Sequence, residues 1–556
     1  MSYLRRTKFG PPLLAMALAL ALGFGLARAP QARDALRTTA GTAPGADLSS
    51  QLDLFQSVLY LVQNQYVDAP DNEKLMRGAI DGMLKTLDPH SLYLPPQRAE
   101  KMDEEFHGEY TGIGVQFEIR DGQIVVISPM EGTPSFRLGI RAGDKIVEID
   151  GKPVPKTVTT DDVFKQLRGP AGTTVQVSIE REDEPELLKY TIERAKIPIE
   201  SILYSYMIRP GIGYVRPVRF AQTTGEELED AVAKLKSQGM KELLIDLRSN
   251  SGGLLSQAVD VLDQLVPRDR LLVYTRGRTP SANADYRSSG RYKNADMPVV
   301  VLIDHGSASA SEIVAGAIQD LDRGIVAGTN SFGKGLVQNQ FKLSDGSKLL
   351  LTIAHYYTPS GRLIQRDYTK FEDRDQYALD ALKDDVPSDS VLATRPKFKT
   401  TGGRTVYGGG GIYPDVVIHD PPLLTRPQAD MIQKRVFFEY ATHFVAQHKE
   451  RKWSMEALGK DFKLSDDDWG SLHKVMDNRK VALTDSIWTA DRPFMLWQVR
   501  AELASATLGS EARYKVITEQ DDQLTAALDL FPRASRLLSG GVDTPTPPPA
   551  SKKAHP

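Results

Sequence analysis

The chain of 556 residues contains no cysteine. This absence excludes a disulfide framework, a thiol nucleophile and a thiolate metal site. A strong net charge is also lacking, because 69 Lys and Arg residues nearly balance 72 Asp and Glu residues and leave a net charge of -3. That balance favours neither nucleic acid nor an acidic membrane surface as a partner. The HExxH pattern is absent and the nine histidines show no metal-ligand spacing, so we expect no metal and no cofactor.

Long hydrophobic runs are missing except near the N-terminus. Three basic residues there precede an apolar run over residues 13–26, which is typical of a signal segment. Cleavage after Ala29 is disfavoured by Pro30, so an uncleaved membrane anchor is the alternative, although the run is short for a membrane span. We expect residues 1–29 to be a signal peptide or anchor and residues 30–48 to be a linker. The bulk of the chain would then be exported, to the periplasm or cell envelope.

Residues 49–107 show helical patterns. The first helix is apolar over an unusually wide face, which predicts packing against a second subunit or another domain. A homodimer is therefore one expectation, and an adaptor protein of the envelope is another. A second helix is predicted over residues 73–87, followed by the pattern-breaking stretch LDPHSLYLPP. His90 in this stretch has two interpretations, a catalytic histidine or, more commonly, a turn or core histidine.

The composition changes to short strands and glycine turns over residues 108–197. The motif GIGV (112–115), the later segment AGDKIVEIDG and a helix over 161–169 together resemble a PDZ domain. That resemblance implies that the backbone N–H groups of Gly112, Ile113 and Gly114 hold a terminal carboxylate and that the next strand accepts the peptide. The side-chain pocket would be lined by Ile113, Val115, Val163 and Leu167. Arg168 at the end of the helix is either a regulatory latch to the next domain or a solvated helix-end arginine.

From residue 198 the pattern alternates between strands and helices. A strand (GIGYVRPVRF), a helix over 225–239, the strand KELLID, a further helix and the strand LLVYTRG follow in order. This alternation predicts βαβ units and a largely parallel sheet. Two polar loops, Arg248–Gly253 and Gly306–Ser311, both follow strands. Because ligands bind at the carboxyl ends of parallel strands, we expect these loops to form one site.

The stretch Gly306–Gln338 carries the chemistry. It offers Ser307, Ser309 and Ser311 at alternate positions, then a helix, then Lys334 between two glycines. A strand-to-helix turn that presents hydroxyls, with a lysine on the next loop, suits a serine–lysine hydrolase. Three other interpretations compete.

The first is a helix capping box formed by Ser309 and Glu312. The second is a phosphate loop over Gly328–Lys334, a near match in which Gly335 stands where Ser or Thr would hold magnesium. The third is a solvated loop lysine, because most lysines are exposed. These residues alone do not choose among the three serines.

Several further motifs fall in a consistent order: DLRSNSGG, GSASASE, SFGKGLVQ, YYTPSGRLIQ and GGIYPDV. Together with LDPHSLYL and the PDZ-like segment, they resemble the carboxyl-terminal processing (tail-specific) serine protease family over about residues 50–420. Ser251 departs from the family, which often has proline there. The resemblance implies an α/β protease core of βαβ units, of the crotonase/Clp-protease kind, with an inserted PDZ-like β-rich domain and helical N- and C-terminal regions.

The same resemblance implies the roles of individual residues. Ser309 would be the nucleophile, Lys334 the general base and Gln338 the residue that orients the lysine. The backbone N–H groups of Gly252 and Ala310 would stabilise the oxyanion. A solvated lysine, with a pKa near ~10.4, is protonated at neutral pH, so the mechanism requires burial to lower the pKa of the amine. His305 as the base of a serine–histidine pair is disfavoured, because it lies only four residues before the nucleophile.

The expected activity is that of an exported serine endopeptidase with a Ser–Lys dyad, cleaving proteins near or from the carboxyl terminus that the PDZ domain captures. The expected partners are proteins or peptides with free carboxyl termini. A catalytically silent PDZ scaffold of the envelope is the alternative. The domains are predicted at 49–107, 108–197, 198–426 and 427–540, the last one helical, with an insertion over 366–405 at the surface and a disordered tail over 541–556.

Overall fold

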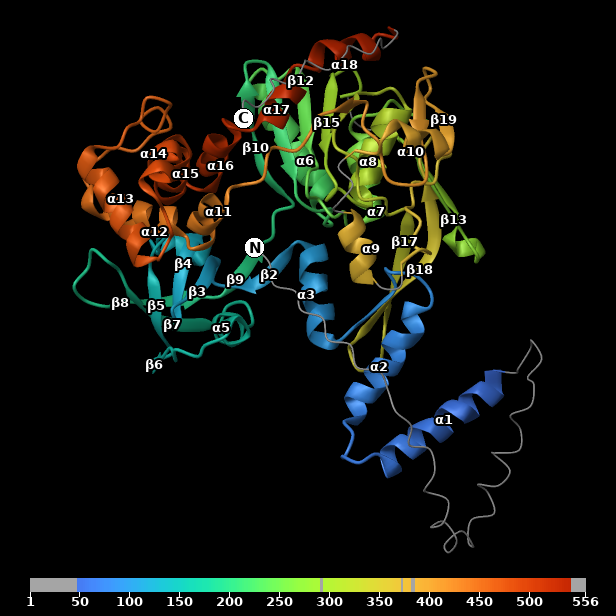
Figure 1. Cartoon of the computed structure of the whole chain (residues 1–556), viewed down its shortest axis with the longest axis horizontal. Coiled ribbons are helices and arrows are strands. Elements are labelled where there is room, and N and C mark those ends of the chain that lie inside the picture. The colour runs from blue at the N-terminus through green and yellow to red at the C-terminus, as the bar shows by residue number, and fades with distance from the viewer. Residues whose placement is uncertain (1–47, 291–293, 372–373, 382–385, 542–556) are drawn as a thin grey trace, which may run out of the picture. The chain divides into compact units, whose positions relative to one another are not determined.

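The computed structural model describes residues 48–290, 294–371, 374–381 and 386–541 (Figure 1). The predicted signal segment, the linker up to residue 47 and the tail from residue 542 lie outside the described residues. Within the part described, no helix combines the length and apolar character needed to cross a membrane. The chain divides into two compact units, residues 1–80 and 81–556.

The first unit contains helix α1 (Leu48–Gln65) and the start of α2 (Asn72–Lys85). Helix α1 buries none of its side chains. Its large apolar residues are exposed by roughly half, with Phe55 at 43% and Leu61 at 56%. An apolar helix face of this width is normally covered by another surface.

The second unit begins with β1 (Leu92–Leu94) and α3 (Pro96–His107), which precede the PDZ-like segment. An antiparallel sheet follows in the order β3-β4-β5-β7-β8, with β6 beside β5, and β2 pairs separately with β9. Helix α5 packs Val163 and Leu167 into the core of this segment. The bounds of its elements are β2 (Glu109–Gly112), β3 (Val115–Arg120), β4 (Gln123–Pro129), α4 (Pro134–Arg137), β5 (Lys145–Ile149), β6 (Lys152–Pro153), α5 (Thr160–Leu167), β7 (Thr174–Glu180), β8 (Leu188–Glu193) and β9 (Ala195–Pro198).

The central sheet has the order β10-β11-β12-β15-β16-β21. All its neighbouring pairs are parallel except β10 with β11, so the predicted largely parallel sheet is confirmed. The strands are rich in β-branched and aliphatic residues because both faces are buried. Their bounds are β10 (Ile202–Arg209), β11 (Ile212–Pro217), β12 (Glu242–Asp246), β15 (Val299–Ile303), β16 (Ile325–Gly328) and β21 (Val416–Val417).

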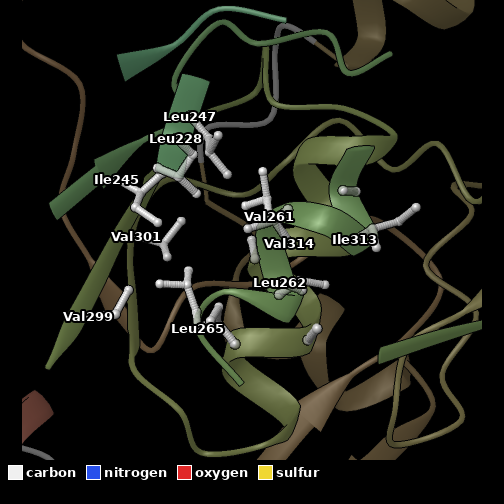
Figure 2. Close-up of a cluster of buried hydrophobic side chains, with 14 of the residues drawn as sticks. Leu228, Ile245, Leu247, Val261, Leu262, Leu265, Val299, Val301, Ile313 and Val314 are labelled. Carbon is white, nitrogen blue, oxygen red and sulfur yellow. The ribbon is translucent and has the colours of Figure 1, made fainter. Parts of the chain in front are cut away.

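Helices cover both faces of this sheet. Helices α6 (Thr224–Ser237), α7 (Leu255–Asp263) and α8 (Ala310–Asp320) pack against Ile245, Val299 and Val301, as Figure 2 shows for part of this core. Alternate strand residues point the other way, and Leu244 and Val300 contact α17 (Asp522–Leu528) and α18 (Phe531–Leu538). The last two helices of the chain therefore form the second layer of the protease core (Figure 1).

One predicted strand belongs to a different sheet. The segment LLVYTRG forms β13 (Leu271–Gly277), which pairs antiparallel with β14 (Ala284–Arg287) and β18 (Lys348–Tyr357). Strands β1 and β17 (Leu336–Lys342) also pair with β18. The prediction that β13 continues the βαβ repeat was wrong, because periodicity identifies a strand but not its neighbours.

The insertion over 366–405 is more than a surface excursion. Among its described residues it forms α9 (Arg374–Ala381), α10 (Asp389–Thr394) and β19 (Lys397–Lys399), the last paired with β20 (Thr405–Tyr407). Tyr377 of α9 is 2% exposed and its ring lies 5.6 Å from that of His90. This insertion therefore contributes to the core beside the LDPHS stretch.

The remaining C-terminal helices form a separate hydrophobic core. It buries Met431, Val436, Phe437, Tyr440 and Phe444. Ion pairs join this region to the PDZ-like domain, including Arg435 with Glu118 and Lys449 with Asp183. The helices are α11 (Arg426–Gln433), α12 (Val436–Gln447), α13 (Asp466–Asn478), α14 (Asp485–Ala490), α15 (Arg492–Leu508) and α16 (Ser510–Thr518).

Candidate active site

The two polar loops meet because β12 and β15 are parallel neighbours. The carbonyl of Asn250 accepts hydrogen bonds from Ala308 N (3.0 Å) and Ser311 Oγ (2.8 Å). Gly252 has a φ of +97°, and a Cβ there would lie 2.8 Å from Ser309 Cβ and 2.9 Å from Ala310 N. The two loops therefore approach each other so closely that only glycine fits at this position.

The three serines have different surroundings. The Ser307 hydroxyl donates to the Leu247 carbonyl (2.8 Å) and the Ser311 hydroxyl donates to the Asn250 carbonyl (2.8 Å). Both residues are fully buried. Ser309 lines a cavity and has φ 55° and ψ -113°, a strained conformation that is common at functional sites. Of the three, Ser309 is the one that a substrate can reach.

Glu312 links the backbone of Ser309 to that of Lys334. Its Oε2 accepts from Ser309 N (2.8 Å) and from Lys334 N (2.9 Å). Its Oε1 accepts from Gly333 N (2.7 Å) and from Ser331 Oγ (2.6 Å). Burial raises the pKa of this carboxyl, against the opposing effect of these donors. Sequence reasoning identified Glu312 only as half of a capping box and missed that it holds both reactive segments.

Lys334 precedes β17 and its amine donates to Gln338 Oε1 at 2.8 Å. The spacing of four residues brings the two side chains together at the start of a strand. Burial lowers the pKa of the Lys334 amine, against the carboxylates of Glu312 and Asp88, so the interpretation as a solvated loop lysine is wrong. Within the described residues the amine is hydrogen-bonded to Gln338 and not to the Ser309 hydroxyl. Such bonds often tighten only when substrate is bound.

Ser309, Lys334 and Gln338 line one cavity of about 540 Å³ together with Gly252 and His90. The apolar part of its wall includes Leu92, Met102, Phe106, Ile313, Leu336, Val337 and Leu350. A cavity of this size, with both apolar walls and convergent polar groups, can hold a segment of peptide. Among the described residues, no group of three His, Asp or Glu side chains is arranged to hold a metal ion.

The two predicted oxyanion donors lie side by side. Ala310 begins α8, where the first N–H groups lack intrahelical acceptors. The Gly252 N–H donates to Asn250 Oδ1 at 2.9 Å. To bind an oxyanion, this N–H has to be shared with Asn250 or released from it, and the role of Gly252 stays a prediction.

The other sequence-based alternatives have different outcomes. The segment from Gly328 leads through a loop into β17 and not into a helix, so the phosphate-loop interpretation is wrong. The Nδ1 atom of His305 lies 3.6 Å from Oδ2 of Asp420. The ring of His90 lies edge-on to those of Phe332 and Tyr377. Burial and the Lys334 charge lower the pKa of His90 to about 3, against a smaller opposing effect of Asp88.

The predicted peptide pocket of the PDZ-like domain is lined by side chains that also form its core. Ile113, Val163 and Leu167 are at most 4% exposed, and Val115 is partly buried. Gly112 ends β2, and Gly114 has φ +79°. Sequence reasoning missed the contact between the Phe117 and Phe164 rings, whose centroids are 5.5 Å apart between β3 and α5.

Arg168 reaches out of the PDZ-like domain. Its guanidinium binds Glu104 of α3 at 2.6 Å and lies over the rings of Tyr110 and Phe164, 4.6 and 4.5 Å from their centroids. It is therefore a paired and stacked residue, and the interpretation as a solvated helix end was wrong.

A serine that shares a cavity with a buried lysine amine, in a chain with a PDZ-like domain, fits the class of serine-type hydrolases. Comparison with protein families agrees with this class. The model of peptidase family S41 matches residues 211–370, and the PDZ domain model matches residues 111–192. The model described as the activating protease CtpB N-terminal domain matches residues 22–97.

Two curated relatives have closely related sequences. A carboxy-terminal-processing protease of Bartonella bacilliformis is 40% identical over 319 residues, which are 57% of this chain and 73% of the relative. The carboxy-terminal processing protease CtpB of Bacillus subtilis is 35% identical over 318 residues, 57% of this chain and 66% of the relative. A solved photosystem II D1 C-terminal processing protease is 29% identical, with 66% of this chain and 87% of that chain covered and a TM-score of 0.35.

The chain belongs to the carboxy-terminal processing protease family, with an embedded PDZ domain. It is a serine-type peptidase of a family named for processing at carboxyl termini, which favours the protease over the silent scaffold.

Proposed function

We propose that the protein is an exported endopeptidase that uses a Ser309–Lys334 dyad to cleave proteins near or from their carboxyl termini. The observation that carries this proposal is the hydrogen bond of 2.8 Å between the buried Lys334 amine and Gln338, in the cavity that Ser309 also lines. A lysine whose pKa is lowered by burial has an unprotonated fraction that can act as a general base.

In the proposed mechanism the neutral Lys334 amine removes the proton of Ser309 Oγ as that oxygen attacks the peptide carbonyl carbon. Gln338 accepts one N–H of the amine, so that the nitrogen lone pair faces the serine. The oxyanion is stabilised by the Ala310 N–H and, once released from Asn250, by the Gly252 N–H, each worth about 2.7–4 kcal/mol. The ammonium of Lys334 then protonates the leaving amine, and water hydrolyses the acyl-enzyme.

The PDZ domain would select the substrate. Its loop over residues 112–114 supports capture of a terminal carboxylate, and an apolar tail would enter between β3 and α5. Because that space holds the Phe117–Phe164 contact, a bound tail has to displace these rings. Arg168, which connects α5 to α3 through Glu104, is the residue that we expect to sense this change.

The test of the dyad uses an unfolded protein with an apolar tail. Wild type should cleave it, and Ser309→Ala and Lys334→Ala should not. The same substrate with an amidated carboxyl terminus should bind more weakly, with a raised KM, because the PDZ loop lacks its anion. Equal cleavage by all three proteins would refute the dyad, and equal KM for both substrates would refute capture of the carboxylate.

Export to the periplasm or envelope and self-association complete the proposal. The apolar run over 13–26 supports export, and cell fractionation with N-terminal sequencing tests both location and cleavage of the segment. The exposed apolar face of α1 supports a homodimer. An envelope adaptor that covers the same face is the other partner we infer, and light scattering of the purified protein distinguishes the two.

A further inference from the structure

The amide of Gln338 has two ends, and both are bound. Its Oε1 accepts from the Lys334 amine, and its Nε2 donates to the backbone carbonyl of His90. A glutamine amide can rotate by half a turn and exchange oxygen for nitrogen. An acceptor fixed at the Nε2 side prevents that rotation, because the oxygen is then the only group left to face the lysine.

The His90 carbonyl is held by a tight turn, the segment Asp88–Ser91, named here the Asp88 loop. Asp88 Oδ1 accepts from His90 N (2.7 Å) and Ser91 N (2.8 Å), and its Oδ2 accepts from Ser91 Oγ (2.6 Å). An aspartate that bonds the backbone just after it is a standard way to fix a turn. Burial raises the pKa of Asp88, but these hydrogen bonds outweigh it and lower the pKa overall.

The loop is also anchored from outside. Ser91 is fully buried, and its Oγ accepts from Thr352 N of β18 at 3.2 Å. Its carbonyl accepts from Arg374 of α9. Strand β1 starts at the next residue and pairs with β18, with Leu92 opposite Leu350. The loop is therefore fixed relative to the same sheet that carries Gln338 on β17.

The imidazole of His90 is not needed for this arrangement. The ring lies between Phe332 and Tyr377, and its Nε2 is buried without a hydrogen-bond partner in the described structure. With a pKa of about 3 the ring is neutral at physiological pH. A neutral ring adds no second positive charge beside Lys334.

We propose that the Asp88 loop positions the general base: Asp88 fixes the turn, the His90 carbonyl fixes the Gln338 amide, and that amide orients the Lys334 amine. Asp88 and the main chain of His90 are positioning residues that act through Gln338. The inference rests on the proposed Ser309–Lys334 dyad. It assigns a role to the LDPHS stretch, whose His90 precedes Gln338 by 248 residues in the sequence.

The test measures kcat, KM and the pH profile of the full-length protein. Asp88→Ala should lower kcat roughly 10- to 100-fold, the expected loss for a catalytic group displaced by about 1 Å, with KM nearly unchanged. In the double variant with Gln338→Ala the loss should not exceed that of Gln338→Ala alone, because both changes remove one function. If the kcat losses of Asp88→Ala and Gln338→Ala multiply in the double variant, the two residues act independently and the proposal is overturned.

Two conservative variants separate charge, position and ring. Asp88→Asn keeps an acceptor for the turn, so most of kcat should return. The groups that face the Lys334 amine are Glu312, Asp88 and His90. Loss of the Asp88 charge lowers the pKa of Lys334, and the acid limb of kcat/KM should move to lower pH. His90→Phe should cost only a few-fold, and a loss as large as that of Lys334→Ala would assign the chemistry to the imidazole and refute the proposal.

The matched control is Asp345→Ala. Asp345 fixes a turn between β17 and β18 in the same manner, accepting from Ser347 N (3.0 Å) and Ser347 Oγ (2.5 Å), and it should leave kcat unchanged. If Asp88→Ala does not fold, the proposal is tested by the two conservative variants instead. The measurements are then the shift of the acid limb of kcat/KM in Asp88→Asn and the kcat of His90→Phe. Activity retained in Lys334→Ala would refute the dyad, whereas an inactive Lys334→Ala with multiplying Asp88 and Gln338 effects refutes only the positioning role.

Discussion

Gly252 makes the closest approach between the two loops of the site, so Gly252→Ala is a sharp test of the geometry. The new Cβ would lie 2.6 Å from Ala308 O, 2.8 Å from Ser309 Cβ and 2.9 Å from Ala310 N. Two of these atoms belong to the backbone, so rotation of a side chain cannot relieve the overlap. The loops have to separate, which moves the Gly252 peptide away from the oxyanion position.

The magnitude follows from two contributions. A left-handed φ costs an alanine roughly 1–2 kcal/mol of stability. Loss of one oxyanion donor costs about 2.7–4 kcal/mol in the transition state, which lowers kcat about 10²–10³-fold. The expected result for Gly252→Ala is therefore moderate destabilisation together with a large fall in kcat.

Gly239→Ala provides the matched control. Gly239 has φ +92°, close to that of Gly252, but nothing lies within 4 Å of its added Cβ. This variant should show the conformational cost alone, seen as a lower melting temperature with unchanged kcat. Steady-state cleavage of the apolar-tailed substrate compares the two. If the kcat of Gly252→Ala stays within about threefold of that of Gly239→Ala, the assignment of Gly252 to the oxyanion site is refuted.

Three further predictions concern stability and assembly. Lys334→Met should raise the melting temperature at pH 7, because folding of the wild type buries an amine whose pKa is lowered. Below about pH 10.4 the lysine of the unfolded wild type holds its proton more firmly than that of the folded protein, which favours unfolding. The gain in melting temperature of the variant should therefore vanish above that pH. Arg248→Gln should destabilise the protein by roughly 3 kcal/mol. Acid unfolding of this variant should begin at a higher pH, because burial raises the pKa of Asp246 and Arg248, together with Arg216 and Tyr214, holds it at about 2. The control is Arg276→Gln, which removes the exposed ion pair of Arg276 with Asp285. In denaturant titrations this variant should lose less than about 1 kcal/mol of unfolding free energy. Replacement of Phe55 and Leu61 of α1 by serine should halve the mass in light scattering, and a monomeric wild type would refute the homodimer.

The sequence determined the order of the elements and most of the chemistry. Hydrophobic periodicity identified β11, β12 and β13 as strands, with the helices between them, since local burial leaves a local pattern. The reasoning that both polar loops follow parallel strands placed Asn250 and Ser309 at one edge, as the register of β12 with β15 confirms. The family resemblance, carried by motifs in order, is also confirmed.

The structure corrected the points that depend on contacts between distant segments. Periodicity could not tell that β13 pairs with β18 and not with the parallel sheet. The sequence predicted a helix after the three serines but not that every residue of this helix, α8, is buried. It is buried because the helix lies between the sheet and the segments around Thr358 and Ile412. The position of Tyr377 beside His90 could not be predicted either, because this contact joins segments that are distant in the sequence.

The choice among the three serines illustrates the division best. Their spacing in sequence is regular, and no local property distinguishes the middle one. Only the fold brings the Leu247 and Asn250 carbonyls, about 60 residues away, onto the hydroxyls of Ser307 and Ser311. A buried hydroxyl must be hydrogen-bonded, so those two serines are satisfied by backbone, and Ser309 alone of the three faces the cavity with Lys334. The sequence supplied a set of candidate residues, and tertiary contacts decided which of them a substrate can reach.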